Sequence, residues 1–253
     1  MGTEKLDVAF IKQAANAAES VPVQEEKKDE VPVNPSPQKP DPKETVTKPQ
    51  PMPVHPHTIP TDEFGWRPVP SMRPIPILVR DKPDGGREYK TCIIGIIEDM
   101  NNYLDLISLI ESLTQEDSLT AYYHTPGGNA LVGLRLYEAF RACKGSTHGV
   151  IVESAASAGA MSISGMDTIE MGPYSFFMYH WSSQNIGGHS MNVEQVTNAW
   201  NQYLDKYARE TVSRGLITEE EYTSMRESCS DVYVTKQQMI IRTDGTPPQF
   251  SGD

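Results

Sequence analysis

The sequence has few cysteines, no long apolar run and no recognisable targeting segment. Its 253 residues include only three cysteines, Cys92, Cys143 and Cys229. Their odd number and wide spacing fit neither a disulfide framework nor a metal-ligand motif, and they are typical of a reducing compartment. The longest apolar stretch, near residues 92–97, is far too short to span a bilayer, and the amino-terminal residues lack the basic-then-apolar pattern of a signal peptide. We therefore predict a cytoplasmic protein that needs no metal and no membrane.

Basic residues are also scarce, with 22 lysines and arginines against 34 acidic residues and a net charge of −12. Residues 1–60 hold 7 basic and 9 acidic groups and contribute −2, which leaves −10 for the remainder. An acidic body without a basic stripe argues against nucleic acid or an anionic membrane as a partner. The sequence also lacks a glycine-rich phosphate loop with Lys and Ser/Thr, so an ATP-driven step would require another polypeptide.

Proline is rare except in one segment, because 16 of the 20 prolines lie between Pro22 and Pro83. Such proline-dense sequence lacks the backbone donors and the apolar density of a packed core. We expect residues 1–62 to be a disordered extension, in which residues 6–14 could form one short helix, either a docking peptide or part of a solvated tail. Residues 63–89 are interpreted as a linker and hairpin, and residues 90–253 as one domain.

Strand-like and helix-like patterns alternate through the rest of the chain. Strands are predicted at residues 75–80 and 87 onward, around the turn 83–86, and then at 90–97, 119–124, 147–152, 168–171 and 175–179. Apolar residues at helical spacing predict helices over 103–113, 131–140 and 193–214, the last with Val196, Ala199, Trp200, Tyr203, Leu204 and Tyr207 on one face. This order predicts an α/β fold with parallel strands joined by right-handed crossovers.

Ser157 is the strongest candidate for a functional residue. It follows a predicted strand and opens a helix rich in small residues. Gly127 and Gly128 follow the preceding strand, and ligands collect at the carboxyl ends of parallel strands, so both loops are expected to face one pocket. A serine hydroxyl needs a base and a site for the oxyanion, and glycine lets a backbone amide approach a carbonyl closely. The amide of Ala158 is a natural second donor.

The base is expected to be a histidine from elsewhere in the chain. His180 ends the predicted strand 175–179, where a side chain is well placed to enter a pocket. An isolated histidine is more commonly a hydrogen-bonded core or surface residue, and this is our interpretation of His124, His148 and His189.

Three motifs together resemble the proteolytic subunit of the ATP-dependent Clp protease. They are Tyr123-His-Thr-Pro-Gly-Gly-Asn129, Ala155-Ala-Ser-Ala-Gly-Ala160 and Met178-Tyr-His180, and the resemblance covers residues 90–240. It implies the fold shared with crotonases, a superhelix of repeated β-β-α units with a protruding handle helix. It also implies Ser157 as nucleophile, His180 as base, Gly128 and Ala158 as oxyanion donors, and a homo-oligomeric ring that acts on peptides or proteins.

The same resemblance implies further residues. An aspartate before a short polar helix completes the triad in the family, and Asp231 matches that context, with Asp167 and Asp205 as competitors. Gly187 and Gly188, together with Gly127, resemble residues that bind the substrate backbone. The helix over 193–214 resembles the one that packs ring against ring, although its apolar stripe could equally be core.

The sequence also departs from the family. The short helix that normally lies between the hairpin and the first core strand, at the rim where the AAA+ unfoldase docks, has no counterpart here. This departure and the extension resemble the Clp-like peptidases of bacteriophages that process head proteins. Two alternatives to a serine endopeptidase remain open: a crotonase-like acyl-CoA enzyme, and a non-catalytic ring-forming assembly protein.

Overall fold

The structure, a computed structural model, describes residues 62, 64–71, 74–83, 85–181 and 190–242. The elements run in the order β1 (Arg67–Pro68), β2 (Ile77–Asp81), β3 (Arg87–Ile97), the 3-10 helix η1 (Met100–Tyr103), α2 (Leu104–Ser112), β4 (Ser118–Gly128), α3 (Ala130–Ala142), β5 (Ser146–Ala156), α4 (Ala158–Ile163), β6 (Thr168–Met171), β7 (Phe176–Tyr179), α5 (Ser190–Ser213), α6 (Glu219–Ser228), β8 (Val232–Thr235) and α7 (Lys236–Arg242).

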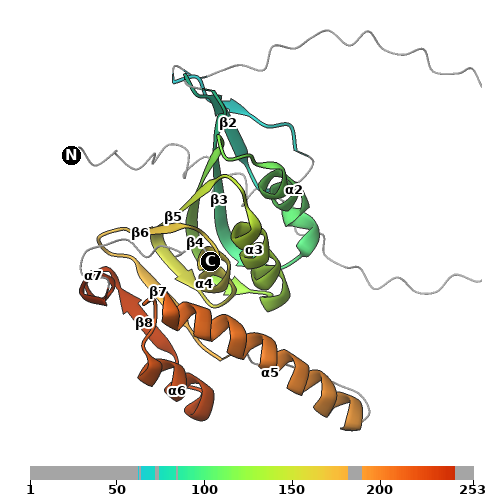
Figure 1. Ribbon diagram of the computed structural model, residues 1–253, viewed down its shortest axis with the longest axis vertical. Helices are drawn as coiled ribbons and strands as arrows, with labels where there is room; N and C mark the ends of the chain where they lie inside the picture. The colour runs from blue at the N-terminus through green and yellow to red at the C-terminus, as the bar shows by residue number, and fades with distance from the viewer. Residues whose placement is uncertain (1–61, 63, 72–73, 84, 182–189, 243–253) are drawn as a thin grey trace, which may run out of the picture.

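One mixed sheet forms the centre of the molecule (Figure 1). Its strands lie in the order β1-β2-β3-β4-β5-β7-β8, and β6 pairs with β5 beside that path. The pairs β3-β4, β4-β5, β5-β6 and β5-β7 are parallel, whereas β1-β2, β2-β3 and β7-β8 are antiparallel. The predicted α/β fold with parallel strands is therefore confirmed.

The main core lies between the sheet and helices α2, α3 and α4. The apolar side of each helix supplies fully buried residues, among them Leu106, Leu136 and Ile163. Local sequence fixes where these helices begin: the Asn129 side chain accepts the Leu131 N–H at the start of α3. This cap stands directly after the paired glycines of β4, so the end of that strand and the start of α3 are held together.

Strands β3 and β4 differ from the sequence-based prediction. The hairpin arm and the expected strand 90–97 form a single strand, β3, because its pairing with β2 over residues 87–91 overlaps its pairing with β4, which begins at Glu88. β4 continues past His124 to Gly128, because pairing resumes after a register shift between Ile94 and Ile96. β6 and β7 do not pair with each other but lie one after the other along β5.

Helix α5 projects from the body with its amino-terminal end outermost (Figure 1), as expected for a handle helix. Its predicted apolar stripe is only partly buried: Leu204 and Tyr207 lie in the core, whereas Val196 and Tyr203 are more than half exposed. Val196 lies in the projecting amino-terminal half of the helix, and Tyr203 is turned about 100° around the helix axis from the buried Leu204. None of the helices in the described part of the chain is long and apolar enough to cross a membrane.

Candidate active site

Ser157 occupies the sharp turn between β5 and α4. Its backbone has φ 53° and ψ −119°, and it is one of two non-glycine residues with positive φ among those that the structure describes. The turn is held from both sides, because the Ser157 N–H donates to the Met178 carbonyl at 2.9 Å and the Ser157 carbonyl accepts the Met161 N–H at 2.9 Å. Strained backbone that is held so firmly is a recurrent feature of functional sites, and strand-to-helix turns of this kind expose a serine hydroxyl.

His180 reaches the same place from the neighbouring strand. β7 runs parallel to the end of β5, with Met178 paired to Ala156. β5 ends at Ala156 and β7 ends at Tyr179, so the residues that follow the two strands, Ser157 and His180, lie at the same edge of the sheet. The His180 Nε2 lies 2.7 Å from the Ser157 Oγ. This is a hydrogen-bond distance, and an imidazole in this position can accept the hydroxyl proton.

Asp231 lies on the other side of His180. The antiparallel register of β7 and β8 pairs Tyr179 with Val232, which brings the residues just beyond that pair, His180 and Asp231, next to each other. The Asp231 Oδ1 is 4.0 Å from the His180 Nδ1, too long for a hydrogen bond but within ion-pair range once the imidazole is charged. From the sequence we expected Asp231 to lie directly before a short polar helix. In the structure, strand β8 separates it from helix α7.

The two competing aspartates are engaged elsewhere. The Asp167 carboxylate accepts the backbone N–H and the hydroxyl of Thr147, at 2.7 and 2.9 Å, at the opposite end of β5. The Asp205 carboxylate, on α5, accepts hydrogen bonds from the Tyr222 hydroxyl and the Arg209 guanidinium. The hydrogen bond from Tyr222 is the main reason that the pKa of Asp205 lies below its usual value. Of these three aspartates, Asp231 is therefore the one that the fold brings within ion-pair range of His180.

Of the paired glycines of β4, Gly127 lies against Ser157 and Gly128 lies against β3. A Cβ added to Gly127, which has φ +95°, would lie 2.5 Å from the Ala156 carbonyl oxygen and 2.6 Å from the Ser157 Cβ. A Cβ added to Gly128 would instead meet the Ile97 carbonyl oxygen of β3 at 2.2 Å. Only glycine fits either position without movement of the backbone.

The amide of Gly127, a predicted substrate-binding residue next to the predicted oxyanion donor Gly128, has a partner within its own strand. The Gly127 N–H donates to the Thr125 Oγ1 at 3.0 Å, and that hydroxyl donates in turn to the Gly95 carbonyl at 2.6 Å. The Gly127 amide is therefore committed within the strand. Ala158 is buried as the first residue of α4. The backbone N–H groups at the start of a helix have no partner within the helix and favour a negative charge placed beside them.

A mostly apolar pocket opens beside Ser157 and His180. Its walls come from four helices and the end of β7, and are formed by Ala130, Ala158, Met161, Tyr179, Trp181, Leu204, Tyr207, Ala208 and Met225. Sequence reasoning did not identify these wall residues, because they are dispersed and only the helical repeat of α5 marks two of them as buried. Such a pocket suits an apolar side chain held next to the serine.

Two of the predicted substrate-binding residues, Gly187 and Gly188, lie outside the described residues. Among the residues that the structure does describe, no group of three or more His, Cys, Asp or Glu side chains is arranged to hold a metal ion.

Comparison with protein-family models matches residues 92–237 to the family described as Clp protease. The matched segment contains the Gly127–Gly128 pair, Ser157, His180 and Asp231. No match was found among the curated proteins.

Proposed function

Because the Clp protease model matches more than half of the residues, the chain belongs to the Clp protease family, and we propose that it is a serine endopeptidase with Ser157, His180 and Asp231 as its triad. Membership of the family makes the protein a serine peptidase of the Clp type. The observation that carries the assignment of the triad is the 2.7 Å distance between the His180 Nε2 and the strained Ser157.

The reaction begins when the Ser157 Oγ attacks the peptide carbonyl carbon and transfers its proton to the His180 Nε2. Asp231, on the Nδ1 side, stabilises the imidazolium that forms. The backbone amides of Gly128 and Ala158 are the proposed donors to the oxyanion, and loss of one such donor typically costs about 10²- to 10³-fold in kcat. His180 then protonates the leaving amine, which departs and leaves an acyl group on Ser157. A water molecule, activated by His180, releases that acyl group and restores the serine.

The apolar pocket beside Ser157 supports a preference for substrates with an apolar side chain next to the cleaved bond. It adjoins the Ser157 hydroxyl, and its wall residues Met161, Leu204 and Met225 carry no charge. An apolar side chain on the acyl side of the cleaved bond would lose contact with water there without leaving a polar group unpaired. We propose that peptides with such a residue at this position are the favoured substrates.

We also propose that the protein forms a homo-oligomeric ring in the cytoplasm and that its role resembles that of the phage peptidases. The extension, the linker with hairpin, and the peptidase domain are proposed to meet at residues 62 and 89. The exposed Val196 and Tyr203 on α5 support self-association, because apolar side chains gathered on a projecting helix favour contact with another surface. β3 runs without interruption from Arg87 to Ile97, which supports the absence of the family's docking helix for an AAA+ unfoldase.

The function is tested with Ser157→Ala in the full chain. This variant should lose both labelling by a fluorophosphonate probe and cleavage of fluorogenic peptides that carry an apolar residue before the scissile bond. Ser175→Ala is a matched control, because it removes a buried hydroxyl that donates to the Gly172 carbonyl in the turn before β7. Undiminished cleavage by Ser157→Ala would refute the proposal. Labelling of Ser157 would also count against an acyl-CoA enzyme, and Ser157-dependent cleavage against a purely structural subunit.

The third triad residue needs its own comparison. Asp231→Asn should lower kcat by about 10²- to 10⁴-fold, since an amide no longer stabilises the imidazolium. Asp205→Asn alters an aspartate that is engaged by Tyr222 and Arg209, and should leave kcat unchanged. An unchanged kcat in Asp231→Asn would remove this residue from the mechanism.

A further inference from the structure

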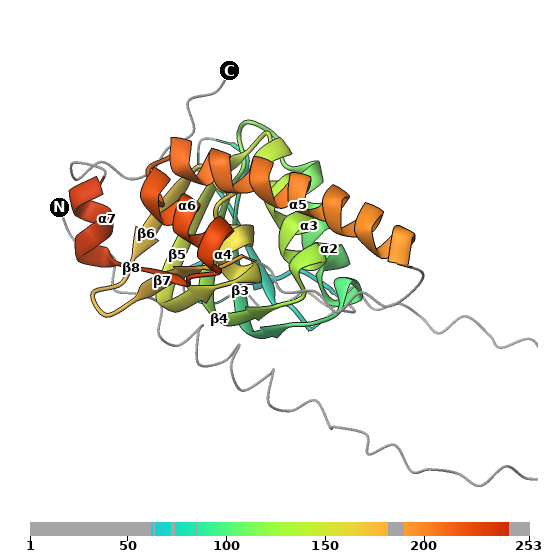
Figure 2. The ribbon, with the colours of Figure 1, turned by 90° about the horizontal axis from the view of Figure 1, so that it is seen from below.

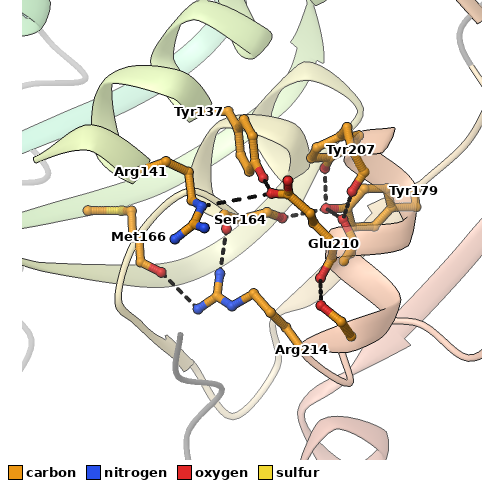
Figure 3. A network of polar contacts seen from close by, with 10 residues as sticks. Tyr137, Arg141, Ser164, Met166, Tyr179, Tyr207, Glu210 and Arg214 are labelled. Atoms are coloured by element: carbon orange, nitrogen blue, oxygen red, sulfur yellow. Dashed lines mark hydrogen bonds and ion pairs between the residues drawn. The ribbon is translucent and has the colours of Figure 1, made fainter. Parts of the chain in front are cut away.

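Figure 3 shows a series of hydrogen-bonded hydroxyl groups, two of which belong to residues that line the pocket. Tyr179 and Tyr207, which are 3% and 5% exposed, both line the pocket beside Ser157 and His180. The Tyr207 hydroxyl donates to the Tyr179 hydroxyl, which is hydrogen-bonded to the Ser164 Oγ and lies 3.2 Å from the Thr211 Oγ1. These groups join three elements that carry or border the site, namely α4, β7 and α5.

The direction of the hydrogen bonds follows from the number of hydrogens available. The Ser164 hydroxyl donates to the Ala160 carbonyl at 2.6 Å, and the Thr211 hydroxyl donates to the Tyr207 carbonyl at 2.9 Å. Each of these hydroxyls has one hydrogen and so cannot also donate to Tyr179; the Tyr179 hydroxyl, with its own single hydrogen, donates to the closer Ser164 Oγ. The series therefore runs one way, from Tyr207 through Tyr179 and Ser164 to the Ala160 carbonyl.

Two members of this series, Ala160 and Tyr179, lie close in sequence to the two halves of the proposed catalytic pair. Ala160 lies in the first turn of α4, three residues after Ser157. Tyr179 is the last residue of β7, and the next residue is His180. The hydroxyls thus tie the turn that holds the serine to the strand end that holds the histidine.

Burial keeps these hydroxyls protonated. It raises the pKa of Tyr179 to about 12 and raises the pKa of Tyr207 well above its usual value. The donors of the series are therefore present over the whole pH range in which a serine–histidine pair works.

We infer that Tyr179 and Tyr207 are positioning residues, whose hydroxyls fix the separation of Ser157 and His180 while their rings form the base of the substrate pocket. This inference rests on the proposed function. It assigns the two tyrosines no contact with the reacting atoms, and their effect passes through β7 and α4.

The inference is tested with Tyr179→Phe, Tyr207→Phe and the double variant in the full chain. Phenylalanine keeps the ring contacts, including the 4.6 Å separation of the Phe177 and Tyr179 ring centroids, and removes only the hydroxyl. Each single variant should lower kcat and the rate of fluorophosphonate labelling about fivefold to tenfold with little change in KM, because a looser catalytic pair affects the chemical step and not the pocket. The double variant should lose no more kcat than the worse single variant, since removal of either hydroxyl interrupts the same series of hydrogen bonds.

Two further variants separate positioning from a general loss of helix packing. Tyr137→Phe is the matched control: its hydroxyl bonds Glu210 and so also ties α5 to the body, but it contacts neither Ser164 nor Tyr179 (Figure 3). It should retain the wild-type kcat. Ser164→Ala removes the hydroxyl that links Tyr179 to the Ala160 carbonyl of α4, and it should reproduce the loss of kcat expected for Tyr179→Phe.

Wild-type kcat in both single variants, an equal loss in Tyr137→Phe, or multiplicative losses in the double variant would each overturn the inference. The Ser157→Ala variant distinguishes this failure from failure of the proposed function. If Ser157→Ala is inactive and the tyrosine variants match the wild type, only the positioning role fails. If Ser157→Ala still cleaves peptides, the proposed function fails as well.

Discussion

Replacement of Gly127 with alanine would place a methyl group directly against the proposed nucleophile. The new Cβ would lie 2.6 Å from the Ser157 Cβ and 2.5 Å from the Ala156 carbonyl oxygen, whereas ordinary contacts begin near 3.4 Å. Moving the Ser157 Cβ from 2.6 to 3.4 Å requires a shift of about 0.8 Å. The nearby groups are backbone atoms and a Cβ, so no flexible side-chain end is available to absorb the shift.

The magnitude of the effect follows from this shift. A misplacement of about 1 Å at a reacting group can lower the rate about 10²-fold, which corresponds to roughly 2.7 kcal/mol. Alanine at φ +95° also adds backbone strain of about 1–2 kcal/mol to the folded state. We therefore expect Gly127→Ala to lose about 10²-fold in kcat/KM and to unfold at a lower denaturant concentration than the wild type.

Gly95→Ala separates these two effects. Gly95 also has a positive φ, +76°, but a Cβ there would have nothing within 4 Å. It should share the backbone strain and keep its activity. The assays are kcat/KM on an apolar peptide, the rate of fluorophosphonate labelling, and urea unfolding of all three proteins. Activity of Gly127→Ala within threefold of wild type, or an equal loss of activity in Gly95→Ala, would refute the steric argument.

Two charged residues, Arg214 and Asp205, give predictions for the free energy of unfolding. Arg214 is 8% exposed and donates to the carbonyls of Ser164 and Met166. Arg214→Met should therefore lower the free energy of unfolding, measured in urea, by roughly 2–4 kcal/mol, because it leaves buried acceptors unpaired. A loss below about 0.5 kcal/mol would contradict this prediction. The hydrogen bond from Tyr222 lowers the folded-state pKa of Asp205 below 3.8, so its stabilisation is present above pH 3.8 and is lost as the pH falls through the folded-state pKa. Asp205→Asn should therefore be less stable than the wild type at pH 7, and the difference should shrink as the pH falls below 3.8. A difference in unfolding free energy that stays constant as the pH is lowered would contradict the linkage.

The parallel part of the fold could be predicted because its sequence patterns are local. Short apolar runs separated by helical repeats have one common arrangement, a parallel sheet with crossover helices. The same rule brings the ends of neighbouring strands together, which is why Ser157 and His180 were expected in one pocket and lie 2.7 Å apart. The catalytic roles of these residues remain predictions.

Strand lengths could not be predicted in the same way. β4 extends beyond His124 through a proline and two glycines, residue types that usually end a strand. It continues because β3 remains available as a partner after a register shift, and that partner is more than 25 residues away in the sequence. Tertiary pairing here overrides local propensity.

The walls of the pocket depend on contacts that no local pattern encodes. The helical repeat of α5 indicates that Leu204 and Tyr207 share a face, but it does not indicate what that face meets. Nor does it predict that Tyr203, one residue earlier, is 56% exposed. The series of hydroxyl groups was missed for the same reason, since Tyr179 and Tyr207 are separated by 28 residues.

The strained turn at Ser157 explains why so much of the nearby structure is rigid. A positive φ at a non-glycine residue costs about 1–3 kcal/mol, and it persists only where the surroundings hold it. Here the Met178 carbonyl holds the Ser157 N–H from β7, and the closely packed Gly127 backbone leaves no room for the turn to relax. The contact from β7 also fixes the strand whose end bears His180. The interactions that maintain the strained serine are therefore the same ones that set its distance to the proposed base, so a substitution that relaxes the turn should also weaken the catalytic pair.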